Sequence, residues 1–181
     1  DWSSDVCSSD LFPDSPEGPG SIFLLDTEAY LRQAAQFKAS FQDQILLLSG
    51  VELGLQADYA EAIQAYAASY PFDFIIGSSH VCHGRDPYYP SFHQGRRQEE
   101  AYLEYFESIL ENIRLFSAFD VYGHLDYVVR YGPDRDRNYT YETYRDIFDA
   151  ILRLLIEKGK GIELNTGGLK AGMRDVHPCT A

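Results

Sequence analysis

The chain has 181 residues, of which 45% are hydrophobic, and its formal net charge at pH 7 is −13. A chain of this length can bury one sizeable core, and its negative charge repels nucleic-acid backbones and anionic membrane surfaces. No apolar stretch approaches the roughly 18 residues of a membrane-spanning helix. Cys7, Cys82 and Cys179 are odd in number and lack CxxC spacing, which favours a reducing compartment. We expect a soluble cytoplasmic protein that binds neither nucleic acid nor membrane, with its oligomeric state left open.

The first 20 residues are expected to lie outside the folded domain. Residues 1–11, DWSSDVCSSDL, are polar, lack a hydrophobic period and resemble the translation of a sequencing-library adapter. Residues 13–20, PDSPEGPG, are rich in turn formers and are typical of a mobile lead-in. The sequence therefore predicts an artefactual or disordered segment at 1–20 and a partial domain at 21–181. A disordered natural tail is the alternative for the first segment.

Helices and strands alternate along the remaining chain. Apolar residues recur at helical spacing over four segments, which are 26–41, 58–69, 98–116 and 141–158. Short apolar runs that end in glycine or polar residues predict strands at 45–55, 72–77, 119–126 and 161–168. Asp26 and Asp58 are predicted to cap the first two helices, and Gly159 to end the last. The alternation predicts an α/β fold with a parallel sheet, without distinguishing an open sheet from a barrel.

Polar residues of metal-binding type follow the predicted strands. The strands end in VELG, GSSHVCH, GHLD and ELNTGG, which brings Glu52, His80, His124 and Asn165 to one edge of a parallel sheet. One glutamate and two histidines are a common ligand set for zinc, manganese or iron, and a glutamate can bridge two ions. Each histidine alone would more often be simply solvated. Their convergence predicts a site for divalent metal ions.

The loop that follows the second predicted strand carries further candidates. His83 and His93 lie there with Tyr88 and Tyr89. A mobile polar loop is the simpler interpretation, and contact with a substrate is the alternative.

Arg130 follows His124 by six residues, in HLDYVVRYGP. Its planar guanidinium could hold a phosphate dianion within an otherwise acidic protein. The alternative is a surface arginine paired with Asp134 or Asp136. The sequence contains no Walker loop, no GxGxxG after a strand and no GxSxG, so simple nucleotide-binding and acyl-transfer sites are disfavoured.

Several blocks of the sequence resemble a known family. GVELGLQ, FDFIIGSSHVCHGRDPYYP, FDVYGHLDYVVRYGP and EKGKGIELNTGGLK are similar, over about residues 22–177, to histidinol-phosphate phosphatases of the polymerase-and-histidinol-phosphatase (PHP) superfamily. The resemblance implies a distorted seven-stranded (β/α) TIM-like barrel, here incomplete, with its first and last strands missing. It also implies a trinuclear centre of manganese, zinc or iron. The implied reaction is hydrolysis of L-histidinol phosphate, a small-molecule phosphate ester, to L-histidinol and phosphate in histidine synthesis.

The resemblance also implies roles for individual residues. Glu52 is similar to the carboxylate that bridges two ions, and His80 and His124 to imidazole ligands of the second ion. Arg130 resembles the catalytic, substrate-binding phosphate clamp. The loop from residue 83 to residue 97 resembles the substrate-specific insertion, whose predicted substrate contacts are Tyr88, Tyr89 and His83.

The sequence departs from the family pattern at both ends. An HxH pair is expected before Phe12 and an Asp-Ala-His-type motif beyond Ala181, and neither is present. His177 falls in the linker before the last motif and is not counted as a ligand. With ligands for essentially one ion, this segment alone is expected to bind that ion weakly and to show little turnover. The alternatives are a PHP phosphoesterase acting on a nucleotide or a phosphotyrosine, or a catalytically silent binding domain.

Overall fold

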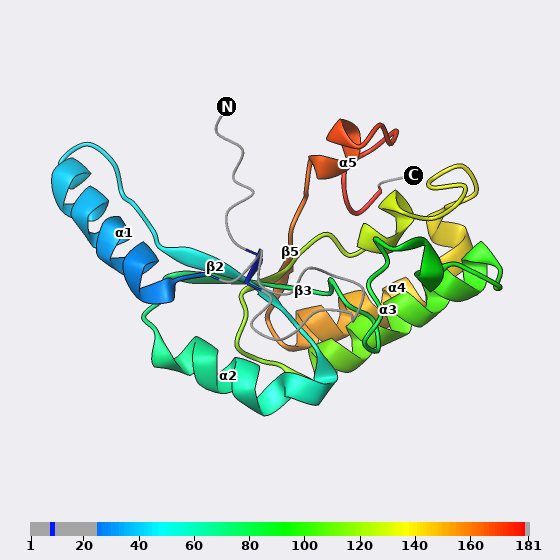
Figure 1. The fold of residues 1–181 in the computed structure, drawn as a ribbon, viewed down its shortest axis with the longest axis horizontal. Coiled ribbons are helices and arrows are strands. Elements are labelled where there is room, and N and C mark those ends of the chain that lie inside the picture. Colours follow the sequence, from blue (N-terminus) through cyan, green and yellow to red (C-terminus); the bar gives the residue numbers. More distant parts are fainter. Residues whose placement is uncertain (1–7, 10–24, 180–181) are drawn as a thin grey trace.

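Five short strands form one parallel sheet. The structure, a computed structural model, describes residues 8–9 and 25–179. The strands lie side by side in chain order and run in the same direction (Figure 1). They are β1 (Ser8–Ser9), β2 (Gly50–Gly54), β3 (Phe74–Ser78), β4 (Val121–Tyr122) and β5 (Gly161–Ile162). The predicted parallel α/β class is confirmed, and the described strands leave the sheet open between β1 and β5.

Helices connect the neighbouring strands, and one more helix follows the last strand. They are α1 (Thr27–Phe41), α2 (Ala60–Ser69), α3 (Gln98–Leu115), α4 (Tyr141–Glu157) and the short α5 (Gly167–Lys170). The described residues also contain three 3₁₀ turns, η1 (Ala57–Tyr59), η2 (Pro90–Phe92) and η3 (Tyr127–Arg130). Figure 1 shows α3 and α4 packed side by side, while α1 extends away from them. None of the described helices combines the length and apolarity needed to cross a bilayer.

The core lies largely along α3. The predicted apolar stripe of this helix is confirmed, because its aromatic and aliphatic members are all fully or almost fully buried, namely Tyr102, Phe106, Ile109, Ile113 and Phe116. The rings of Phe106 and Phe148 of α4 lie 4.7 Å apart between centroids. α3 is thus held against α4, and Tyr105 and Asn112 of α3 hydrogen-bond the carbonyl groups of Ser79 and Leu55, just beyond the ends of β3 and β2.

The helix ends partly follow the predictions. Asp26 caps α1, since its carboxylate accepts the N–H of Ala29 at 2.9 Å. Gly159 follows α4 with a φ of +65°, as expected for a glycine stop. The predicted cap at Asp58 is wrong, because Asp58 lies inside η1 and α2 begins after Tyr59 without a side-chain cap.

The strand predicted at 45–55 is shorter than expected and begins at Gly50. The preceding Leu46 is 87% exposed and lies in no strand. β2 pairs with β3 from Gly50 opposite Phe74, so continuing the register toward the amino terminus would place Pro71 opposite Leu47. Pro71 has no N–H to donate, which limits the ladder at that end.

One strand, β1, falls within the predicted lead-in. Ser8 and Ser9 pair in parallel with Glu52 and Leu53 of β2. The other residues of the segment 1–20 lie outside the described residues. The division of the chain after residue 20 therefore stays a prediction.

Candidate metal centre

Three polar side chains from three strand ends meet at one point. Glu52 lies within β2, and His80 and His124 each follow their strand by two residues. Glu52 Oε1 lies 3.1 Å from His80 Nε2 and 3.0 Å from His124 Nε2, and the two Nε2 atoms are 3.3 Å apart. The side chains of Glu52, His80 and His124 are 22%, 12% and 7% exposed. The predicted convergence is thus present, in a shielded position that a small solute can reach.

The spacing of these atoms fits a divalent cation. Zinc binds imidazole nitrogen and carboxylate oxygen at about 2.0–2.2 Å, which sets neighbouring ligand atoms of a tetrahedral site about 3.3 Å apart. The observed separations of 3.0–3.3 Å match that value closely. One carboxylate and two imidazoles also form a donor set that suits zinc, manganese or iron. Glu52, His80 and His124 could therefore hold one such ion.

The charge of Glu52 is favourable for this role. Burial alone raises the pKa of its carboxyl group, but the neighbouring imidazoles of His124 and His80 lower it by more. The net result is a pKa well below the usual value of 4.5. Glu52 is therefore an ionised carboxylate at neutral pH, ready to bind a cation.

The backbone around His124 is closely constrained. His124 has a φ of +22°, and its N–H donates to Glu163 Oε2 at 3.1 Å. A Cβ atom on the preceding Gly123 would lie 2.3 Å from Ser78 Oγ and 3.0 Å from Ile76 Cγ2. Any larger residue would have to displace these side chains of the neighbouring strand. This close approach brings His124 against the end of β3.

Glu163 also links Asn165 to the site. Asn165 Nδ2 donates to Glu163 Oε2 at 3.2 Å, and the backbone of Asn165 pairs with that of His177. Asn165 thus lies at the edge of the sheet predicted for it. Glu163 links it to His124, and no described contact joins Asn165 to the side chains of Glu52, His80 or His124.

A buried polar network lies beneath His80. Tyr105 of α3 donates its hydroxyl to the carbonyl of Ser79 at 2.6 Å, and Asn112 of the same helix donates to Ser79 Oγ at 3.0 Å. The hydroxyl groups of Ser79 and Tyr122 are 2.6 Å apart. Burial raises the pKa of Tyr122, which therefore stays a neutral hydroxyl. The network fixes Ser79, the residue before His80. In the sequence, the sign of this network is the polar Asn112 on a largely apolar face of the helix.

Tyr127 provides an aromatic wall that sequence analysis missed. Its ring centroid lies 5.0 Å from that of His124, 5.7 Å from that of His80 and 5.0 Å from that of Tyr131. Burial, followed by the nearby Tyr131 and Asp86, raises its pKa well above the usual value. The ring therefore packs as an uncharged group against both histidines.

Arg130 lies next to this wall. Its guanidinium carbon is 5.5 Å from the Tyr127 ring centroid and 5.9 Å from that of Tyr131. In the described part of the chain, neither Asp134 nor Asp136 forms an ion pair with it. The arrangement favours the predicted anion-binding interpretation over a surface ion pair.

Tyr88 joins the same group of rings. Its centroid lies 5.3 Å from that of Tyr131 and 5.2 Å from that of Tyr89. Tyr88 is 58% exposed, so one side of its ring faces solvent. Tyr88, Tyr131 and Tyr127 thus form a continuous aromatic surface that leads toward the histidines.

His83 lies elsewhere. Its Nε2 is 3.3 Å from Glu111 Oε2 and its Nδ1 is 3.6 Å from Glu104 Oε1, and both glutamates belong to α3. Cys82, His83 and Glu104 form a second group of possible metal ligands. Burial raises the pKa of the Cys82 thiol to about 11, which disfavours the thiolate that a metal would need. Two arginines, Arg85 and Arg96, already pair with Glu104, which disfavours a further cation there. The described contacts do not connect His83 to the three ligands, and its role as a substrate contact stays a prediction.

Two other histidines lie apart from Glu52, His80 and His124. His93 is buried, and its Nε2 lies 3.3 Å from the carbonyl oxygen of Pro87. His177 is fully buried and contacts Asp126 and Arg130, not the three ligands. That His177 is not a metal ligand stays a prediction.

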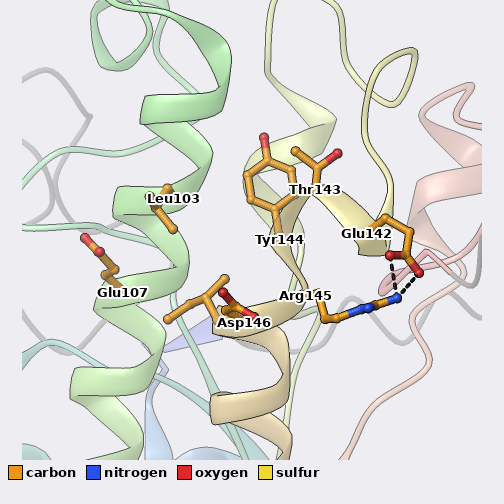
Figure 2. A pocket seen from close by; sticks show the side chains of 8 residues that line it. Leu103, Glu107, Glu142, Thr143, Tyr144, Arg145 and Asp146 are labelled. Atoms are coloured by element: carbon orange, nitrogen blue, oxygen red, sulfur yellow. Dashed lines mark hydrogen bonds and ion pairs between the residues drawn. The ribbon is translucent and has the colours of Figure 1, made fainter.

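A recess of about 660 Å³ lies between α3 and α4, away from these residues. Figure 2 shows its lining, which includes Glu107 of α3 and a Glu142–Arg145 ion pair of α4. None of the predicted site residues lines it. The candidate site is therefore the edge of the sheet and not this recess.

A parallel sheet with a Glu-His-His cluster at the carboxyl ends of its strands defines an α/β protein with a candidate metal centre. Comparison with known families identifies the family to which this chain belongs. The chain belongs to the PHP domain family, whose model matches residues 10–167.

Individual relatives agree with this assignment. The chain is 35% identical over 149 residues to the histidinol-phosphatase of Lactococcus lactis subsp. lactis (strain IL1403), covering 82% of this chain and 55% of that protein. It matches the crystal structure of histidinol phosphate phosphatase from the same organism, complexed with zinc, L-histidinol and phosphate, with a TM-score of 0.79 and 33% identity. That match covers 87% of this chain and 59% of that one.

A second solved structure, from Listeria monocytogenes, matches with a TM-score of 0.69 at 19% identity, over 84% of this chain and 63% of that one. At this identity it supports the fold alone. The chain spans about half the length of the curated relatives that it matches, from 54% to 58%.

Proposed function

We propose that this protein is a metal-dependent phosphomonoesterase that hydrolyses L-histidinol phosphate to L-histidinol and phosphate. The observation that carries the proposal is the convergence of Glu52, His80 and His124 within 3.3 Å of one another. The Lactococcus lactis relative, solved with zinc, L-histidinol and phosphate, supports the choice of substrate and of a divalent ion.

Glu52, His80 and His124 are the proposed metal ligands. When bound, divalent ions supply positive charge for the phosphoryl oxygens and activate water for in-line attack. The resemblance noted in the sequence implies a trinuclear centre in a complete distorted barrel, in which Glu52 would bridge two ions. We extend the proposal to that centre, with manganese, zinc or iron as the metal.

Arg130 is the proposed phosphate clamp. A guanidinium offers paired N–H donors that match phosphate oxygens, and it would stabilise the negative charge that grows on them during hydrolysis. Its position beside Tyr127, which packs against both histidines, supports this role.

Tyr88 and Tyr89 are the proposed contacts for the amino-alcohol part of the substrate. The ring contact between Tyr88 and Tyr131, and the solvent-exposed side of Tyr88, support a role for this surface at the site entrance. His83 is retained as a proposed substrate contact on the resemblance alone. We also propose a cytoplasmic location, since cysteine usage and a biosynthetic substrate both suit a reducing compartment.

Ligand binding provides the sharpest test, because it reports directly on the contacts proposed for Glu52 and Arg130. With Zn²⁺ present, calorimetric titration should show L-histidinol phosphate binding more tightly than adenosine monophosphate or phosphotyrosine. Binding should weaken strongly in Glu52→Gln and in Arg130→Gln. Equal or tighter binding of the other two esters would identify a different phosphoesterase. Affinity that is unchanged in both variants would reject the site itself.

A further inference from the structure

A buried histidine–carboxylate pair lies behind Arg130. His177 Nδ1 is 2.5 Å from Asp126 Oδ1, although 51 positions separate the two residues. Both side chains are fully buried. Burying a carboxylate costs free energy unless its oxygens are well hydrogen-bonded, so the partners of Asp126 decide what the pair does.

The carboxylate of Asp126 is fully engaged. Besides His177 on Oδ1, it accepts the N–H of Cys179 at 2.8 Å on Oδ2. Because a carboxylate accepts hydrogen bonds, the proton of the His177 ring lies on Nδ1. The Nε2 atom then carries a lone pair and points in a fixed direction.

That lone pair faces Arg130. Arg130 Nε lies 3.4 Å from His177 Nε2 in donor geometry, at the long end of the hydrogen-bond range. The rings of Tyr127 and Tyr131 pack on the same guanidinium. The Nε donor is thereby used by the protein, whereas no described residue hydrogen-bonds the terminal nitrogens, which can therefore meet a ligand.

The glycine turn after β5 gives Arg130 its space. A Cβ atom on Gly167 would lie 2.8 Å from Arg130 Nη2, so a larger residue would push against the guanidinium. The N–H of Gly167 donates to Asn165 Oδ1 at 2.7 Å, which fixes the turn. Segments that are distant in the chain therefore converge on one arginine.

We propose that Asp126 and His177 are positioning residues for phosphate binding. Asp126 accepts the His177 Nδ1–H, and His177 Nε2 accepts the Arg130 Nε–H. This relay of two hydrogen bonds holds Arg130 in place. The proposal rests on the proposed phosphate-clamp role of Arg130. A guanidinium held before the ligand arrives loses less conformational entropy on binding, which increases affinity.

The first experiment uses the unaltered chain and needs neither metal nor phosphate. Long-range ¹⁵N–¹H spectra should show the His177 ring with its proton on Nδ1 and an unprotonated Nε2. The Arg130 Nε–H signal, assigned by its loss in Arg130→Lys, should exchange slowly with solvent. A proton on Nε2 would overturn the proposal, because Arg130 could not then donate to it.

The second experiment compares three substitutions. His177→Phe keeps an aromatic ring at this position but removes both nitrogens. It should make the exchange of Arg130 Nε–H with solvent fast and weaken the binding of inorganic phosphate about 10-fold. His177→Gln can still donate to Asp126 and accept from Arg130, and should restore much of both properties. The matched control is His93→Phe, the same substitution at another buried histidine, which should leave both unchanged.

The outcomes separate this proposal from the proposed function. If the unaltered chain fails to bind phosphate but His177→Phe still accelerates exchange at Arg130, the relay stands and the clamp role fails. If exchange and phosphate affinity are the same in His177→Phe as in the unaltered chain, the Asp126–His177 pair only anchors the carboxyl-terminal segment and the proposal is overturned. Should His177→Phe not fold, His177→Gln and the ring spectra still decide the question.

Discussion

His80 and His124 direct their Nε2 atoms to within 3.3 Å of each other, although 44 positions separate them. Two neutral acceptor nitrogens at this distance repel one another unless a proton or a cation lies between them. Both atoms also face the same Glu52 oxygen. The pair is therefore best explained as a set of lone pairs gathered for one positive ion.

Replacing Glu52 tests that explanation directly. Glu52→Gln removes the negative charge while keeping the shape, and we expect zinc affinity to fall about 100-fold. Competition with a chromophoric chelator measures the affinity. The matched control is Glu61→Gln, at an exposed position of α2, which should bind zinc as the unaltered chain does. Equal affinity in Glu52→Gln and Glu61→Gln would contradict the assignment of Glu52.

Gly123 is expected to be essential for the position of His124. Its missing Cβ leaves room for Ser78 Oγ, so Gly123→Ala should destabilise the fold by about 1–3 kcal/mol and also weaken zinc binding. Gly50→Ala is the comparison, since its Cβ would lie 2.9 Å from the carbonyl oxygen of Phe74 at the far end of β2. It should be destabilised to a similar degree while retaining zinc affinity. Urea unfolding and zinc titration of both variants provide the measurements, and equal loss of zinc affinity would argue against a local effect at His124.

The sequence predicts the order of the elements and the three ligands for a simple reason. Parallel strands end at one edge of a sheet, so polar residues after successive apolar runs must approach one another. Glu52, His80 and His124 could be found by this rule without coordinates. The same rule predicted Asn165 at that edge, although its contact is indirect, through Glu163.

Other features depend on contacts that no local pattern contains. The pairing of His177 with Asp126 joins segments 51 positions apart, and His177 lies outside any regular element. The exposure of Leu46 could not be predicted either, because an apolar run indicates burial but does not say whether a neighbouring strand extends far enough to cover it. Tyr127 could have been suspected from its place between His124 and Arg130, but its contact with His80 required the tertiary structure.

The network beneath His80 should contribute both to stability and to the site. Tyr105→Phe removes the hydroxyl that donates to the Ser79 carbonyl, and leaving that buried acceptor unpaired should cost about 1–3 kcal/mol. Zinc affinity should fall only a few-fold, because His80 loses a support and not a ligand atom. Tyr144→Phe is the control, since the Tyr144 hydroxyl has no hydrogen bond among the described residues. A large stability loss in Tyr144→Phe as well would show that the effect is not specific to the Ser79 contact.

Asp73 should make the stability of the chain depend on acid pH. Lys38 donates to its carboxylate at 2.5 Å and the N–H of Ser49 at 2.7 Å, which together hold its pKa below the usual value of 3.8. A carboxyl group with a lowered pKa in the folded state adds stability above its unfolded value, and that stability is lost as the pH falls toward the folded value. Urea unfolding between about pH 6 and pH 2 should therefore show a steeper loss of stability for the unaltered chain than for Asp73→Asn. Asp43→Asn, at an exposed position after α1, should keep the steep profile, and identical profiles for all three chains would exclude Asp73 as the source.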